Sequence, residues 1–241
     1  MTTPLERALG DWSAWGLSLS APPTVKAELD SGRTNRNYRL SAPGLGDDLL
    51  LRLHRPDAER LGIDRGRERL VTRQTAAAGI GRPILYWTEG YSIFPFIEAR
   101  PWNESDFSEP AQRERLWPLV DALAELDVGS PRRRYSDYLQ RYWQQLIDLD
   151  RIDASLQREW SAFQADLRAF DHAGWSAGLV HHDLIPANIL DTGDRLVLID
   201  WEYAAMGHPG IDRWTVDPGS IDEPLIGDLM DWINRLWARL L

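Results

Sequence analysis

Two aspartates and an asparagine have residue types and spacing suited to chemistry on phosphate groups. Asp183 lies in the segment 181–184, Asn188 follows five residues later, and Asp200 follows twelve residues after Asn188. A carboxylate can accept the proton of a hydroxyl group, and carboxylate and amide oxygens are suitable ligands for Mg²⁺. These residues can act together only if the chain between them brings them into one place.

The segment between Asn188 and Asp200 predicts a β-hairpin. Asp191-Thr192-Gly193-Asp194 is a turn-forming tetrad between β-prone residues, and Leu196-Val197-Leu198-Ile199 is an apolar run that leads to Asp200. Paired strands lie about 4.8 Å apart, so the outer ends of a hairpin converge. We expect Asn188 and Asp200 to share one small volume beside the loop that carries Asp183.

The loop itself follows the His-x-Asp-Leu-x-x-x-Asn pattern of kinase catalytic loops. In that pattern the Asp accepts the proton of the nucleophile and the Asn holds a magnesium ion. His181, Asp183 and Asn188 fit, and His182 stands at the usual Arg position. The alternative is that the carboxylates and the amide are ordinary turn residues and that the two histidines are merely buried. The hairpin that ends in Asp200 favours ATP-dependent phosphoryl transfer.

The elements around this motif divide the chain into a β-rich first part and a mostly helical second part. Strands are expected at 24–29, 37–40, 49–53, 83–87 and 91–97, with one helix at 64–78 ended by Gly79. Later apolar residues recur at helical spacing, as in 138–147, 163–170 and 229–240. We predict a nucleotide-binding lobe at 1–97 and a catalytic lobe at 98–241, with ligands in the cleft between them.

The first lobe should supply the groups that handle phosphate. Arg52 lies in an apolar strand and Glu68 in the following helix, the order in which kinases place their phosphate-binding cation and its orienting Glu. Arg can bind phosphate oxygens in bidentate fashion. Weaker candidates for nucleotide binding are the loop residues Ser31, Gly32 and Asn35 and the linker residues Phe96 and Ile97. The alternatives are a surface Arg and a surface Glu for Arg52 and Glu68, an ordinary hairpin turn for the loop, and core packing for Phe96 and Ile97.

The amino-acid composition argues against several other classes of protein. Lys26 is the only lysine among 27 basic residues, so the chain has no Gly-Lys-Ser/Thr triplet and no P-loop. There is no cysteine, and the net charge of −10 disfavours a nucleic-acid partner. We expect no membrane partner and a cytoplasmic location, because the chain shows no signal sequence and no apolar run of the ~18–20 residues that cross a bilayer.

These motifs together resemble the aminoglycoside phosphotransferase/choline kinase superfamily, and most of all its thiamine kinases and choline kinases. The resemblance runs from about residue 24 to residue 214 and is carried by 31–39, 50–53, 63–68, 181–190 and 198–204, with 142–145. It implies an α+β, two-lobed protein-kinase-like fold, with a small β-rich N-terminal lobe and a larger, mostly helical C-terminal lobe.

The resemblance also implies residue roles. Asp183 would be the catalytic base, His181 would brace its loop, Asn188 and Asp200 would be magnesium ligands, and Arg52 with Glu68 would orient the phosphates of ATP. The chain departs from the family pattern at Ser31, where a second Gly is usual, and at 126–127, where Leu-Asp replaces Leu-His. The segment after Asp200 is short, so we expect a reduced acceptor pocket or one completed by a second copy of the chain in a homodimer.

The predicted reaction is magnesium-dependent transfer of the γ-phosphoryl group of ATP to a small cationic alcohol. Aromatic faces attract cations, so the candidate acceptor-binding residues are aromatic or acidic: Tyr138, Tyr142, Trp143, Glu202 and Trp214. Helix packing is the alternative for the first three. An aminoglycoside or amino-sugar phosphotransferase and a non-catalytic nucleotide-binding module remain alternatives. Three features disfavour a protein kinase. Ile185 stands where protein kinases have a basic residue, and Trp201-Glu202 replaces their Phe-Gly. The 41 residues after Asp200 are too few for an activation segment and a peptide-docking helical lobe.

Overall fold

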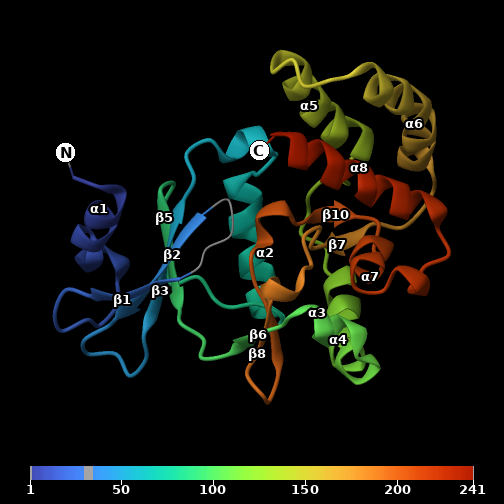
Figure 1. Ribbon diagram of the computed structural model, residues 1–241. Helices are drawn as coiled ribbons and strands as arrows, with labels where there is room; N and C mark the ends of the chain where they lie inside the picture. Colours follow the sequence, from blue (N-terminus) through green and yellow to red (C-terminus); the bar gives the residue numbers. More distant parts are fainter. Residues whose placement is uncertain (1, 30–34, 241) are drawn as a thin grey trace. The chain divides into compact units, whose positions relative to one another are not determined.

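The computed structural model describes residues 2–29 and 35–240, and these form two compact units (Figure 1). The first unit comprises Met1–Trp102 and Ala187–Glu202, and the second comprises Asn103–Pro186 and Tyr203–Leu241. The first unit therefore extends past the expected lobe boundary at residue 97 and also takes in the segment with Asn188 and Asp200. In the described part of the chain, no helix combines the length and the apolar character needed to span a bilayer.

An antiparallel five-stranded sheet forms the centre of the first unit. Its strand order is β1-β2-β3-β5-β4. Every residue of the central β3 is buried, which explains why the sequence there is an almost continuous apolar run. The short helix α1 and the 3₁₀ turn η1 add Ala8 and Trp15 to the core against this sheet. The bounds are α1 Pro4–Gly10, η1 Trp12–Trp15, β1 Thr24–Leu29, β2 Asn35–Ser41, β3 Leu49–His54, β4 Tyr86–Trp87 and β5 Tyr91–Pro95.

Two of the strands are shorter than the sequence predicts. The strand expected at 83–87 contains only Tyr86–Trp87, and the strand expected at 91–97 ends at Pro95. Proline has no backbone N–H to donate to a sheet, so Pro83 and Pro95 limit the pairing. The remaining expected strands of this sheet are present, and β3 pairs with β2 and β5 on its two sides.

One helix, α2 (Arg65–Ala77), lies between β3 and β4 along the chain, where the sequence predicts it. The Asp64 side chain caps its N-terminus by accepting a hydrogen bond from the Arg67 backbone N–H at 3.0 Å. Gly79 ends the helical segment with a left-handed φ of 76°, a conformation that suits glycine. The 3₁₀ turn η2 (Ala58–Leu61) leads into the helix. The chain then runs along the predicted hairpin, where the Leu198 N–H donates to the Ile80 carbonyl at 2.9 Å.

The predicted hairpin is confirmed. Strand β8 (Ile189–Asp191) pairs antiparallel with β9 (Leu196–Leu198), and β6 (Arg100–Pro101) joins β8 to complete a three-stranded sheet. Gly193 takes a left-handed φ of 89° in the turn. The 3₁₀ turns η3 (Pro186–Asn188) and η4 (Trp201–Tyr203) flank the hairpin.

Helices make up most of the second unit. The two short strands β7 (Gly178–Val180) and β10 (Ala205–Gly207) pair antiparallel. The helices are α3 Glu104–Ser108, α4 Pro110–Ala124, α5 Tyr135–Asp148, α6 Ala154–His172, α7 Gly210–Val216 and α8 Pro224–Leu240, with the 3₁₀ turn η5 Pro218–Ser220.

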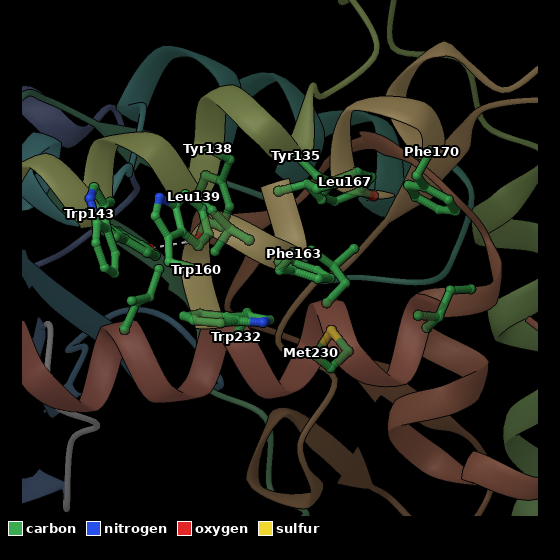
Figure 2. Packing of buried hydrophobic residues seen from close by; sticks show 14 of the residues in the cluster. Tyr135, Tyr138, Leu139, Trp143, Trp160, Phe163, Leu167, Phe170, Met230 and Trp232 are labelled. Carbon is green, nitrogen blue, oxygen red and sulfur yellow. Dashed lines mark hydrogen bonds between the residues drawn. The ribbon is translucent and has the colours of Figure 1, made fainter. Parts of the chain in front are cut away.

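Aromatic residues of α5, α6 and α8 form the core of the second unit (Figure 2). Trp160 stacks on Trp143 with ring centroids 5.0 Å apart and meets Trp232 edge-on at 5.2 Å. Phe163 stacks on Trp232, with ring centroids 5.5 Å apart. The predicted apolar face of α5 is confirmed except at Ile147, which is 49% exposed because it lies at the edge of the stripe.

Candidate active site

Arg52, in the middle of β3, is the centre of a buried charge network in the first unit. Its guanidinium pairs with the Glu68 carboxylate at 3.3 Å, as the sequence predicts. It also binds Asp200 Oδ1 at 2.7 Å and Glu202 Oε2 at 3.0 Å. Only 4% of Arg52 is exposed, so these carboxylates replace the water that a charged group otherwise requires.

Arg65 and Asn35 extend this network. Arg65 Nη1 binds Glu68 Oε2 at 2.6 Å, and Arg65 Nη2 donates to Asn35 Oδ1 at 2.9 Å. The Asn35 amide in turn donates to Glu202 Oε2 at 2.8 Å. We call the whole set the Arg52 cluster: Asn35, Arg52, Arg65, Glu68, Asp200 and Glu202. Glu202, which the sequence suggested for acceptor binding, is thus part of this cluster together with the nucleotide and metal candidates.

Three carboxylates of the Arg52 cluster lie close enough together to hold a metal ion. They are paired with the guanidinium groups of Arg52 and Arg65, and the charge of Arg82 also acts on this cluster. One oxygen from each of Glu68, Asp200 and Glu202 lies within 4.8 Å of the others. Burial lowers the pKa of Arg52, but the neighbouring carboxylates, Asp200 most of all, more than offset this effect and hold the pKa above its ordinary value. Arg52 therefore stays charged.

The hairpin brings Asn188 beside the residue that precedes Asp200. The Ile199 N–H donates to the Asn188 carbonyl at 3.0 Å, and Ile189 pairs with Leu198. Asp200 has a left-handed φ of 68°, which for a residue other than glycine costs of order 1–3 kcal/mol. Its side chain is 27% exposed, whereas Glu68 and Glu202 are almost fully buried. Asp200 is therefore the carboxylate of the cluster that solvent reaches most easily.

In the second unit, Asp212 of α7 holds the backbone of the predicted catalytic loop. Its two carboxylate oxygens accept hydrogen bonds from the His181 N–H at 2.7 Å and from the His182 N–H at 3.1 Å. Burial raises the pKa of Asp212 to about 7, and the two backbone hydrogen bonds oppose that effect. Sequence reasoning missed Asp212. The only signal was an acidic residue directly after Gly210-Ile211 in a short apolar helix.

Asp183 follows immediately in this loop and is half-buried. Its carbonyl accepts a hydrogen bond from the Ile185 N–H at 2.9 Å, while the side chains of His181 and Leu184 are fully buried on either side of it. The loop is therefore fixed by buried neighbours and by Asp212. Asp183 belongs to the second unit, and the Arg52 cluster belongs to the first.

The aromatic candidates for acceptor binding lie mostly in the core of the second unit. Tyr142 and Trp143 are 1% and 3% exposed, and the face of Trp143 is stacked on Trp160. The Tyr138 and Tyr142 hydroxyls are hydrogen-bonded at 2.6 Å, and the Arg133 guanidinium lies over the Tyr138 ring at 4.4 Å. Helix packing accounts for the burial of the three aromatic side chains, and Arg133 from the segment before α5 adds the contact with the Tyr138 ring.

Trp214 is more accessible than these three residues. It is half-buried in α7 and packs against the edge of the core.

The remaining nucleotide candidates are placed only in part. The Phe96 N–H donates to the Asp48 carbonyl at 3.0 Å, and the Arg39 guanidinium lies over the Phe96 ring at 4.2 Å. Ile97 is half-buried. Ser31 and Gly32 lie outside the described residues.

The antiparallel sheet of the first unit and the mostly helical second unit define a protein-kinase-like phosphotransferase fold. Residues 27–217 match the model of the phosphotransferase enzyme family, APH. The chain belongs to this family. The crystal structure of choline kinase LicA from Streptococcus pneumoniae has the same fold, with a TM-score of 0.74 and 18% identity over 99% of this chain and 91% of that one.

Two relatives are similar to this chain in sequence over about two thirds to three quarters of its length. Protein LicA of Haemophilus influenzae is 28% identical over 200 residues, which cover 77% of this chain and 55% of that protein. A probable ethanolamine kinase of Arabidopsis thaliana is 27% identical over 175 residues, or 67% of this chain and 46% of that protein. The chain thus spans about half the length of these relatives.

Proposed function

We propose that this chain is an ATP-dependent kinase that transfers the γ-phosphoryl group to the hydroxyl of a small alcohol. The observation that carries the proposal is the Arg52 cluster, in which a buried cation on a central strand is paired with a Glu from the next helix and with the Asp that follows the hairpin. This is the set of groups that protein-kinase-like enzymes use to position phosphates and metal ions.

Each group of the cluster has a role in the proposed reaction. Arg52, oriented by Glu68, would bind the phosphates of ATP. Asn188 and Asp200 would hold magnesium, and the position of Glu202 next to Asp200 makes it a further candidate ligand. Magnesium, when bound, would neutralise charge on the phosphate oxygens. Most of the rate enhancement would come from positioning and electrostatic stabilisation.

Asp183 would accept or orient the proton of the acceptor hydroxyl. Its carboxylate needs a fixed direction for this task, because small displacements of a catalytic group reduce the rate strongly. The hydrogen bonds of Asp212 to His181 and His182 support that role by fixing the backbone of the two preceding residues.

We infer that the acceptor is a small cationic alcohol of the choline, ethanolamine or thiamine type. The names of the choline kinase LicA structure from Streptococcus pneumoniae and of the probable ethanolamine kinase support the first two compounds. Trp214 is the aromatic candidate that the core leaves most accessible, and a cation over such a ring gains up to about 2 kcal/mol when both are desolvated.

A coupled assay of ADP release would test the proposal. The screen should contain choline, ethanolamine, thiamine, amino sugars and aminoglycosides, each with ATP and Mg²⁺ and each repeated with the Asp183→Asn variant. We expect turnover with a cationic alcohol and its loss in the variant. Turnover with aminoglycosides alone would reassign the acceptor. Magnesium-dependent ATP binding without turnover on any alcohol would instead indicate a nucleotide-binding module.

A further inference from the structure

His182, the residue before Asp183, has a backbone conformation that histidine rarely adopts. Its φ is +63°, in the left-handed region where the Cβ atom of an L-residue is crowded. Glycine and asparagine enter this region more readily than histidine does. Contacts elsewhere in the second unit must therefore hold His182 in place.

Two hydrogen bonds of the imidazole provide that restraint. Nδ1 lies 3.1 Å from the Val180 carbonyl oxygen, and Nε2 lies 3.0 Å from the Tyr135 hydroxyl. A carbonyl oxygen only accepts, so Nδ1 carries the hydrogen in the neutral ring and Nε2 accepts from Tyr135. The Tyr135 oxygen itself accepts from the His208 N–H at 3.1 Å. With a neutral imidazole, the direction of each of these three hydrogen bonds follows.

The surroundings of Tyr135 are built to hold its hydroxyl against His182. Tyr135 is fully buried at the start of α5, and the Asp171 carboxylate accepts hydrogen bonds from the backbone N–H groups of Tyr135 and Ser136 at 2.8 and 2.9 Å. A Cβ atom on Gly207 would collide with the Tyr135 hydroxyl and would lie 2.9 Å from an imidazole carbon of His182. Gly207 therefore leaves room for the Tyr135–His182 pair.

We propose that Tyr135 is a positioning residue for phosphoryl transfer and that it acts through His182 on the direction of Asp183. Asp212 holds the loop by its backbone N–H groups, and Tyr135 holds it by the His182 side chain. Rotation about the His182 backbone would turn the next residue, so loss of the Tyr135 bond misdirects the Asp183 carboxylate. This inference rests on the proposed kinase function.

A double-mutant cycle tests the inference by activity. Tyr135→Phe removes only the hydroxyl, and we expect kcat to fall on the order of 10-fold while KM for ATP stays unchanged. In a His182→Gly background, glycine accepts the left-handed φ and the imidazole is gone, so the same change should have little further effect on kcat. A loss of kcat that comes instead from the missing hydrogen bond of the His208 N–H to Tyr135 would persist in the His182→Gly background. Equal losses in both backgrounds would overturn the proposal.

A matched control separates this effect from the loss of any buried tyrosine hydroxyl. Tyr91 is buried in the first unit, and its hydroxyl is hydrogen-bonded to Trp15 and Asp11 at 3.1 and 3.2 Å. We expect Tyr91→Phe to lower stability but to leave kcat within about twofold of the wild type. A loss of kcat as large as that of Tyr135→Phe would remove the case for a specific effect on the loop.

A spectroscopic readout tests the Tyr135–His182 hydrogen bond, on which the inference rests, even if the wild type turns over none of the tested alcohols. Nitrogen-15 chemical shifts of the histidine rings, assigned by the loss of one set in His182→Gly, report which nitrogen carries the hydrogen. We expect the neutral Nδ1–H form of His182 at pH 7.5. The Nε2–H form would contradict the proposed hydrogen bond from Tyr135, whereas absent turnover with the Nδ1–H form would count against the kinase function alone.

Discussion

Arg52 illustrates at the scale of one residue why an arginine suits the first unit better than a lysine. Its planar guanidinium reaches three carboxylates from one fork, whereas an ammonium group is a point charge without that geometry. The nearly complete burial of Glu68 and Glu202 makes this pairing essential, because a buried carboxylate without a partner is costly. The sequence indicated the Arg52–Glu68 pair but not the size of the network.

Replacing Arg52 by methionine should destabilise the protein by about 3–5 kcal/mol, since it leaves buried carboxylates with too few partners. The free energy of unfolding in urea measures this loss. Arg36→Met is the control, because Arg36 forms a solvent-exposed ion pair with Glu28 whose loss should cost far less stability. Similar losses in both variants would show that the Arg52 cluster contributes nothing special to stability.

Asp212 gives stability a pH dependence with a definite sign. Burial raises its pKa from 3.8 to about 7, so between these values the folded protein retains a proton that the unfolded chain releases. The free energy of unfolding therefore falls as pH rises through this window, by up to about 4 kcal/mol from this group. In Asp212→Asn this contribution is absent, and the variant should lose less stability between pH 4 and pH 7 than the wild type.

Urea unfolding of both proteins at several pH values measures this difference. His54 has the opposite sign, because burial and the charge of Arg65 lower its pKa to about 3 and its contribution to stability is lost as pH falls below 6.5. His54 is present in both proteins, so its effect cancels in the comparison. If the difference in free energy of unfolding between the wild type and Asp212→Asn did not change with pH, the pH dependence could not be assigned to Asp212.

At the scale of elements, the close approach of β7 to the end of α4 positions the start of the predicted catalytic loop. Strand β7 passes the end of α4 at Gly178, where a Cβ atom would overlap the Ala124 carbonyl oxygen. Because β7 leads directly to His181, a shift of this strand moves the loop. The apolar periodicity of α5 predicted its packing face, but nothing in the local sequence around Gly178 indicated which helix it meets.

Gly178→Ala should therefore be destabilising by about 1–3 kcal/mol, because backbone atoms cannot move aside as a flexible side chain can. Gly174→Ala is the matched control, since a Cβ atom at Gly174 meets nothing within 4 Å and should change stability by less than about 0.5 kcal/mol. Thermal unfolding of the two variants gives both values. Equal melting temperatures would mean that β7 moves away from α4 without cost.

At the scale of the whole molecule, the chain contributes to each unit in two separate segments. The first unit is completed only when residues 187–202 join residues 1–102, and this late segment brings Asp200 and Glu202 to Arg52. The charge network of the first unit therefore depends on residues that are separated by about 150 positions in the sequence. Ligands of that network should stabilise the folded chain as a whole.

ATP and Mg²⁺ together should raise the melting temperature more than either does alone, because a ligand that binds only the folded state adds about 2.7 kcal/mol at 100 times its Kd. Differential scanning fluorimetry with and without a chelator measures this effect. Asp200→Asn removes one carboxylate and should abolish the magnesium-dependent part of the shift. A shift that persists in the variant and in the presence of chelator would argue against a metal site at the Arg52 cluster.

The sequence alone determined the features that depend on neighbouring residues. Turn chemistry and the apolar run at 196–199 predicted the 189–198 hairpin, helical spacing predicted α5, and Gly79 predicted the end of α2. Only the tertiary structure decided the partners of buried polar groups. Folding removes charges and N–H groups from water, and these buried groups then need partners. Asp212 is the partner of the loop N–H groups, and Glu202 is a partner of Arg52. No residue spacing in the sequence indicates which residues become such partners.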